Sequence, residues 1–310
     1  MTTELWWFAM NKSADARTLG ICLSKWLLMW TCWQLHPSIW LFARGWGVFV
    51  MWLSAFYVAT MVHNAMHRDV FTVQGVETTW RVILSATFGF PVEAYKPTHN
   101  LNHHVHTQHE EDHLHTSQMK YRSPLLNLLM FFPTVYPGIS KLENEFIRKE
   151  FHKRSWRFVF FVVQVMAAHG TTLALLALDW RRGLLYWLIP NLLAVDAIIT
   201  MNMLQHDGCD MIVRGEHRGS NMEINSARNF VGPVINWFTC NNGYHTIHHM
   251  FSTVHWTEYP ALHAKLVEPH IDPALNEKCI VRYIWRTYIW PGLGPMPLVR
   301  NEGTGQAKKE

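Results

Sequence analysis

Cysteine is scarce in this chain and follows no metal-binding pattern. The five cysteines are odd in number and include no CxxC motif. This argues against a disulfide framework and against a cysteine-ligated zinc site, and predicts reduced thiols. The sequence also contains no cysteine cluster for iron–sulfur binding, no dinucleotide fingerprint and no fused heme-binding module.

Charge is sparse as well, and it forms no dense basic run. The net charge is +4 with the histidines neutral, and it is spread along the chain. This distribution argues against nucleic acid as a partner and is compatible with contact to anionic lipid headgroups. The first 20 residues also lack the charged start, apolar run and small-residue site of a cleavable signal.

Histidine and tryptophan, in contrast, are abundant, with 20 and 16 copies in 310 residues. Mean hydropathy is −0.03 although 49% of the residues are apolar. Such a balance suits a protein divided between membrane helices and a large polar cap. Tryptophan favours the membrane–water boundary, and clustered histidine suggests bound metal.

Four apolar segments have about the 20 residues that a transmembrane helix needs, and they lie near residues 19–36, 39–62, 157–178 and 184–206. We therefore predict an all-α integral membrane protein with a single domain over residues 1–310. The polar stretches 68–156 and 207–300 are expected to form a helical cap. Two hairpins place this cap on one side of the membrane, the side with most Lys and Arg, which should be cytoplasmic.

Nine histidines fall at the cap ends of these segments, in the groups H-N-A-M-H, H-N-L-N-H-H, a lone histidine at the end of the fourth segment, and H-T-I-H-H. They are His63, His67, His99, His103, His104, His206, His245, His248 and His249. Residues three or four apart share one face of a helix, so each group should project its imidazoles the same way. Nine ligands are too many for one zinc ion and suit two ions of higher coordination. Imidazole alone does not choose between iron, copper and zinc.

With these motifs the chain resembles the membrane fatty acid desaturase and hydroxylase superfamily, whose signature is three histidine boxes in this order. Asn202 and His206 form N-x-x-x-H at the end of the last segment, similar to a further ligand helix of acyl desaturases. The resemblance spans roughly residues 51–270 and looks closest to bacterial members. It implies two iron ions, O2 as co-substrate, the nine histidines as ligands, and Asn202 holding one iron through a water.

The resemblance also implies a fatty acyl or other long-chain lipid as substrate and a bacterial inner membrane as the location. Electrons are expected from an external donor of the ferredoxin, rubredoxin or cytochrome type. We predict a fatty acyl desaturase first. A fatty-acid hydroxylase, a terminal-alkene-forming decarboxylase and a carotenoid oxygenase remain open, because fold and ligands do not separate them. A histidine-rich metal transporter is the remote alternative, since it would need ligands along the spans.

Other polar residues near the boxes are assigned supporting parts. Nearby carboxylates could tune the metal ligands; the candidates are Asp69, Glu93, Asp112, Asp207 and Glu223. A second set of histidines should be solvated or support the ligands, with direct metal binding as the alternative, namely His106, His109, His113 and His115. His255 is expected to bond locally, with lining of the site as the alternative.

Two polar residues lie inside the predicted spans. His169 follows the start of the third segment by 12 residues and Asp196 precedes His206 by 10, so their depths agree to about one helical turn. An intramembrane acid is usually paired, which predicts that the two face each other. The alternative is that Asp196 bonds locally to Thr200.

Overall fold

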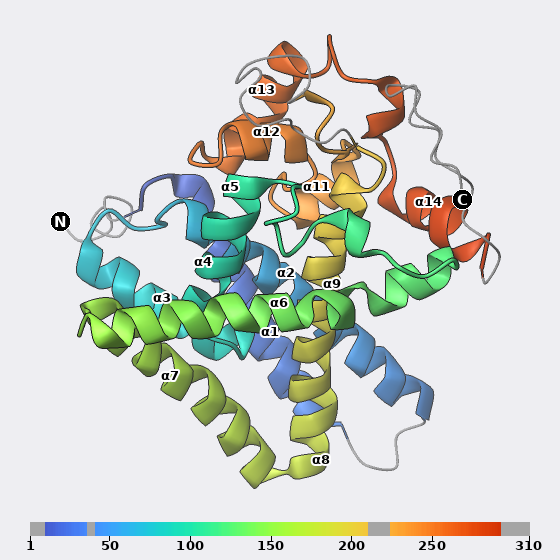
Figure 1. The fold of residues 1–310 in the computed structure, drawn as a ribbon. Coiled ribbons are helices and arrows are strands. Elements are labelled where there is room, and N and C mark those ends of the chain that lie inside the picture. The colour runs from blue at the N-terminus through green and yellow to red at the C-terminus, as the bar shows by residue number, and fades with distance from the viewer. Residues whose placement is uncertain (1–9, 36–40, 210–223, 293–310) are drawn as a thin grey trace.

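The computed structural model describes residues 10–35, 41–209 and 224–292, and it is built mainly of helices (Figure 1). Three helical stretches are long and apolar enough to cross a membrane: Arg44–His67 within α2 (Leu41–His67), α7 (Trp156–Leu178), and the run Trp180–His206. That run joins α8 (Trp180–Gly183), a π-turn η6 (Leu184–Leu188) and α9 (Ile189–His206). These three candidate spans coincide with the second, third and fourth predicted spans, with ends shifted by a few residues.

The first predicted span is not among them. Its place is taken by α1 (Ala16–Trp33), whose 18 residues include Arg17 and Lys25 and therefore reach a lower hydropathy. Lys25 is fully buried, and its Nζ lies 2.5 Å from the carbonyl oxygen of Thr87 and 2.7 Å from Oδ1 of Asn191. The lysine points into the protein, so its charge does not face the outer surface of α1.

Helices α2 and α9 lie side by side at the centre of the molecule (Figure 1). Helix α2 carries small side chains that are at most 1% exposed and recur at helical spacing, including Ala55, Val58, Ala59 and Val62. Small side chains let two helix axes approach closely. The close pairing brings the last turns of α2 and α9 to the same level under the cap.

Helix α7 leaves this central pair. It packs against α3 (Gln74–Phe88), and Figure 1 shows it diverging from α9 above their shared corner at α8. Asp179 caps that corner, accepting hydrogen bonds from the backbone N–H groups of Arg181 and Arg182.

This divergence shows that the predicted His169–Asp196 pair was wrong. His169 is exposed on α7 and its ring lies 6.5 Å from that of Phe90, while Asp196 is half-buried on α9. The alternative was wrong too, because the buried hydroxyl of Thr200 has no hydrogen-bond partner in the described part of the chain. Counting residues gives depth along a helix axis, but it gives no information on the direction in which two helices lean.

Helix α6 (Pro124–His152) crosses in front of α2 and α9 in Figure 1. It begins where Ser123 accepts a hydrogen bond from the N–H of Leu126, with proline at the first helical position, where its missing N–H costs little. It buries Phe131, Val135 and Ile139 and leaves its other face exposed. Neither α3 nor α6 is among the helices able to cross a membrane.

The cap consists of short elements. A contiguous run over the second histidine box contains α4 (Tyr95–Thr98), the π-turn η4 (His99–His103) and α5 (His104–His106). The later part contains α11 (Pro233–Phe238), α12 (His245–Met250), α13 (Tyr259–Leu266), α14 (Ile280–Ile284) and the π-turn η9 (Trp285–Ile289). A parallel pair of two-residue strands, β1 (Asn229–Phe230) and β2 (Asn276–Glu277), links the two ends of this later part. Single 3-10 turns connect the rest: η2 (Ser13–Asp15), η3 (Val92–Ala94), η5 (Thr116–Gln118), η7 (Trp256–Glu258) and η8 (Pro273–Leu275).

Candidate metal centre

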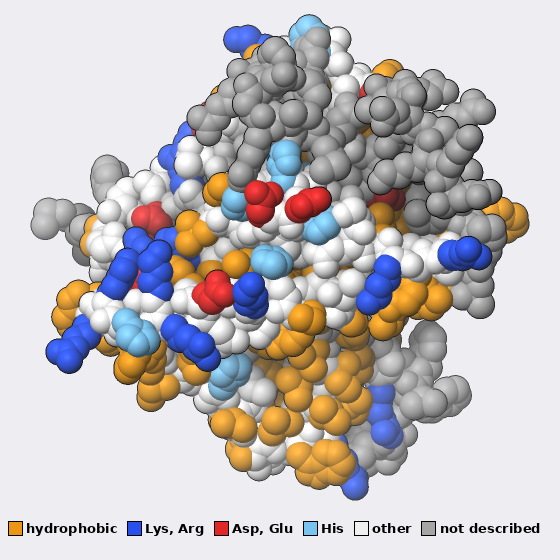
Figure 2. All heavy atoms as spheres, viewed as in Figure 1, with side chains coloured by type: hydrophobic (Ala, Val, Ile, Leu, Met, Phe, Trp, Pro, Cys, Tyr) orange, Lys and Arg blue, Asp and Glu red, His pale blue; other side chains and the backbone are white. Residues whose placement is uncertain are grey.

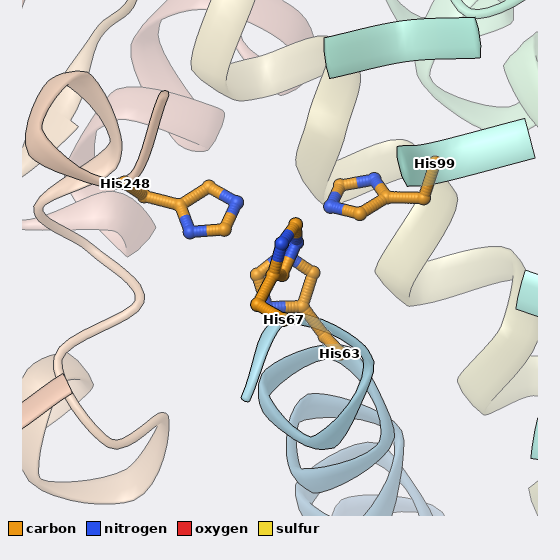
Figure 3. A group of neighbouring side chains, drawn as sticks. All are labelled: His63, His67, His99 and His248. Atoms are coloured by element: carbon orange, nitrogen blue, oxygen red, sulfur yellow. The ribbon is translucent and has the colours of Figure 1, made fainter. Parts of the chain in front are cut away.

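Eight of the nine predicted histidines form two groups of four, and the ligand nitrogens within each group lie within 4.8 Å of one another. We call them the α2 group, which contains His63, His67, His99 and His248, and the α9 group, which contains His103, His206, His245 and His249. Figure 3 shows the α2 group, with His63 and His67 rising from the end of α2 and His99 and His248 approaching from opposite sides.

The elements divide unequally between the two groups. Helix α2 supplies two histidines to its own group, and α9 supplies His206 to the other. The π-turn η4 supplies His99 to the α2 group and His103 to the α9 group. Helix α12 supplies His248 to the α2 group, and His245 and His249 to the α9 group. The expectation that each box projects its rings the same way was therefore wrong for the second and third boxes. Both elements lie between the two groups.

The nitrogens of the α9 group are closely spaced. The Nε2 atoms of His206, His245 and His249 form a triangle whose three sides are all 3.1 Å. Hydrogen bonds along all three sides would need three ring protons aimed into one small space. A cation at the centre of the three lone pairs satisfies all of them at once.

His104 stands outside both groups of four but close to the α2 group. Its Nε2 lies 3.1 Å from Nε2 of His99 and 3.0 Å from Nε2 of His248. Its ring also stacks on that of His249, with 4.5 Å between centroids. His104 thus brings a fifth nitrogen to the α2 group while contacting the α9 group through its ring face.

Two rings of the α9 group are held by strong acceptors on their outer nitrogens. Nδ1 of His206 lies 2.9 Å from the carbonyl oxygen of Ser226. Nδ1 of His103 lies 2.8 Å from Oδ2 of the fully buried Asp112. A carbonyl or carboxylate only accepts, so Nδ1 carries the proton in both rings and Nε2 is left free to bind a cation.

Asp112 is itself fixed by the backbone. Its carboxylate accepts hydrogen bonds from the N–H groups of Gln108 and Leu114, at 2.9 and 2.8 Å. Burial alone would raise its pKa, but the adjacent His103 ring and these hydrogen bonds lower the pKa of Asp112 to about 2. The carboxylate therefore stays ionised at neutral pH. Of the predicted supporting carboxylates, this is the one that contacts a ligand histidine among those the structure describes.

The outer nitrogens of three rings in the α2 group meet neutral partners, at longer distances. Nδ1 of His63 lies 3.2 Å from Oδ1 of Asn64. Nδ1 of His67 lies 3.4 Å from the amide of Asn100, and Nδ1 of His248 lies 3.3 Å from the hydroxyl of Tyr259. Sequence reasoning did not identify Asn100 or Tyr259. Asn100 lies within the second box, but nothing in the sequence brings Tyr259 back to a box that ends ten residues earlier.

The environment of the rings favours the neutral imidazole that a metal requires. Burial, followed by repulsion from neighbouring rings, lowers the pKa values of five cap histidines well below the usual histidine range; these are His99, His104, His245, His248 and His249. Nε2 of His67 and Nε2 of His103 are buried without any hydrogen-bond partner. An unsatisfied buried polar group costs about 1–3 kcal/mol. A bound cation removes that cost, so both groups fit a metal.

Asn202 also carries unsatisfied atoms. Both its amide nitrogen and its amide oxygen are buried without a partner. It lies one turn before His206 on α9, and residues four apart share a helix face.

The other predicted carboxylates have different partners. Asp69 and Glu93 form ion pairs with Arg81, at 2.6 and 2.8 Å. Asp207 accepts a hydrogen bond from the hydroxyl of Tyr283 at 3.3 Å and another from that of Tyr288. Glu223 lies outside the described residues.

The extra histidines divide as follows. Those that follow the second box belong to neither group of four; these are His106, His109, His113 and His115. His255 is buried, and its Nε2 lies 3.0 Å from Oδ1 of Asp15. Its Nδ1 lies 2.7 Å from the hydroxyl of Thr257, so it also bonds locally. Together with His67 and Asp15 it lines a cavity of about 20 Å³ and thus borders the α2 group.

Comparison with known proteins gives one match. The family model described as Fatty acid desaturase matches residues 37–277. This range includes all three boxes, Asn202 and His206. No curated protein and no solved structure matches the chain. The histidines of the matched boxes converge in two groups able to hold metal. Because the family model also covers most of the chain, the chain belongs to the fatty acid desaturase family.

Proposed function

We propose that this protein is an O2-dependent diiron oxidoreductase that desaturates the hydrocarbon chain of a fatty acyl lipid. The observation that carries the proposal is the pair of four-histidine groups at adjacent helix ends, in a chain of the fatty acid desaturase family. In this reaction two hydrogens leave adjacent methylenes, and O2 takes them up with two electrons and two protons to give two waters. Bound iron would supply the redox capacity for attack on an unactivated methylene, which side chains alone lack.

The number of ligands supports iron over a structural zinc ion. Nine histidines exceed the four ligands of each structural zinc site, and imidazole suits iron ions that take more ligands.

We assign all nine histidines as metal ligands. The α2 group with His104 would hold one iron through five nitrogens. The α9 group would hold the other through four nitrogens, with Asn202 adding a water-mediated fifth contact. The unsatisfied amide of Asn202 and its position one turn before His206 support this assignment.

We further propose one domain with four spans, α1 being the remaining span. Asp15, just before α1, contacts His255 and Trp256 in the cap, whereas the end of α1 leads to the start of α2 at the far side of the molecule (Figure 1). Its 18 residues span ~27 Å, close to a bilayer core of ~30 Å. Leu23, Leu27 and Trp30 form an exposed apolar stripe on it.

The orientation follows from charge. The cap side carries most Lys and Arg, which favours the cytoplasm and, for a bacterial protein, the inner membrane. Within the described residues the two histidine groups are the groups able to hold metal. The electrons should therefore come from an external donor of the ferredoxin, rubredoxin or cytochrome type.

A metal transporter is the alternative from a different functional class. It would need ligands distributed along the spans. Here His63, His67 and His206 lie in the last two turns of α2 and α9, and the remaining ligands come from the cap. This arrangement favours a reaction site at one face over a path through the membrane.

The test is to express the protein in a bacterium with a suitable electron donor and to profile acyl lipids, free fatty acids and volatiles by gas chromatography–mass spectrometry. His245→Ala serves as the inactive variant, and His109→Ala, outside both groups, serves as the matched active control. We expect a new double bond within an acyl chain in the wild type and in His109→Ala only.

Other products would revise the proposal in defined ways. An oxygenated chain, a terminal alkene or an altered carotenoid would keep the metal centre but overturn desaturation as the reaction. Product formation by His245→Ala at the wild-type rate would overturn the ligand assignment.

A further inference from the structure

Five basic side chains gather where α6 ends and α7 begins. We call them the α6–α7 corner; they are Arg148, Lys149, Lys153, Arg154 and Arg157, and all five are exposed. Figure 2 shows basic side chains gathered at this end of the molecule, beside the apolar surface that extends below it. Within the part of the chain that the structure describes, one weak ion pair involves the corner, between Lys153 and Glu150 at 3.9 Å.

A groove of about 560 Å³ runs from this corner between α3 and α7. Val82, Val159, Phe160 and Val163 make its wall apolar, and Arg157 stands at its rim. The hydroxyls of the two threonines in the wall, Thr78 and Thr79, donate to backbone carbonyls of their own helix. The wall therefore presents mainly hydrocarbon.

The groove lies at the membrane boundary. Helix α7 is a candidate span that starts at Trp156, and the side chain of Trp156 is 85% exposed. An exposed tryptophan at the start of a span marks the headgroup level. In the most apolar stretch of α7, 11% of the residues are buried inside the protein, compared with 50% in that of α2. From Trp156 onward, the groove thus faces the hydrocarbon of the membrane, with the basic corner at headgroup height.

We propose that the α6–α7 corner and this groove bind one anionic phospholipid. The phosphate lies between Arg154 and Arg157, and one acyl chain lies along the valines of α7. Guanidinium groups suit phosphate oxygens, and a basic cluster beside a span attracts anionic headgroups. A neutral lipid leaves this charge uncompensated, and a soluble acidic protein cannot fill an apolar groove at membrane depth. The site is independent of the chemistry at the histidine groups.

The test is a titration of the full chain, purified in detergent, with phosphatidylglycerol and phosphatidylcholine of identical acyl chains, followed by native mass spectrometry. The headgroup variant is Arg154→Gln with Arg157→Gln, and the groove variant is Val163→Phe. Arg282→Gln, an exposed arginine on the distant α14, is the matched charge control.

We expect phosphatidylglycerol to bind at least tenfold more tightly than phosphatidylcholine. Each cation near an anionic headgroup contributes about a fivefold change in affinity. The headgroup variant should therefore lower the affinity for phosphatidylglycerol by about 25-fold and remove the preference over phosphatidylcholine. Val163→Phe should lower the affinity for both lipids, and Arg282→Gln should change the affinity for neither.

Three results would overturn the site. Equal affinity for the two lipids in the wild type would show that no anionic headgroup is selected. A loss of about fivefold in Arg282→Gln, equal to the loss per arginine in the headgroup variant, would show non-specific attraction. Competition by glycerol phosphate at the same concentration as the whole lipid would show that the groove holds no chain.

Discussion

The two histidine groups contain four histidines each but are supported differently. In the α9 group, His103 and His206 donate from Nδ1 to a buried carboxylate and to a backbone carbonyl, at 2.8 and 2.9 Å. In the α2 group, the outer nitrogens meet amides and a phenol at 3.2–3.4 Å. A short hydrogen bond from a histidine ring holds the ring in place, and a charged acceptor makes the histidine more basic. The α9 group should therefore bind its metal more tightly and release it more slowly.

The largest effect should follow removal of a ligand from either group. His63→Ala in the α2 group and His245→Ala in the α9 group should both reduce product formation below detection, because each metal loses a ligand that no neighbour replaces. Iron measured by plasma mass spectrometry should fall from two to about one per chain in both variants. Full iron content in His245→Ala would contradict the assignment.

Asp112→Asn should have the next largest effect, and it should be confined to the α9 group. Asparagine keeps the shape but removes the charge that holds His103, and loss of such a partner typically costs 10–100-fold in metal affinity. The measurement is a competition titration against a chelator of known affinity. If the affinity of the α2 group for iron fell by as much, the difference in support between the two groups would have another cause.

A smaller effect is expected from the tyrosines behind His206. Tyr288 donates to Asp207, the residue after His206. Tyr288→Phe should lower the free energy of unfolding by about 1.5 kcal/mol, since the lost hydrogen bond is to a charged group. It should lower the metal affinity of the α9 group by less than tenfold. Thermal unfolding checks this, with Tyr136→Phe on the exposed face of α6 as control. An unchanged melting temperature would show that α14 and η9, beyond the family match, do not support the site.

The smallest effect should come from Tyr259→Phe in the α2 group. The contact of Tyr259 with His248 is 3.3 Å long and joins two neutral groups, so its loss should cost about 0.5 kcal/mol, or roughly a twofold change in metal affinity. The same chelator competition measures it. A loss as large as that of Asp112→Asn would show that the two groups are supported equally well.

The sequence predicted which residues would meet, because the histidine boxes are local patterns at the ends of apolar segments. It did not predict how they divide between two groups. His99 and His103 are four residues apart, yet the π-turn η4 places them in different groups. Periodicity also places a residue on a helix face without giving the partner of that face. For this reason Asp112 was one of five carboxylate candidates, and Tyr259 was not a candidate at all.

The membrane region was predicted to a similar extent. Length and hydropathy located α2, α7 and the run ending at His206. The same properties could not show that α7 leans away from α9, which separates His169 from Asp196. They also could not show that Lys25 is buried against Asn191. Both features depend on the directions in which helices pack, and these are set by side chains distant in the sequence.

The most direct test of two unequal iron sites is stepwise removal of iron from the fully loaded protein by a chelator, followed by iron absorbance. The account predicts two phases of one iron each, the slower one belonging to the α9 group and accelerated by Asp112→Asn but not by Tyr259→Phe. A single phase of iron release, or a slow phase whose rate is unchanged by Asp112→Asn, would contradict the account.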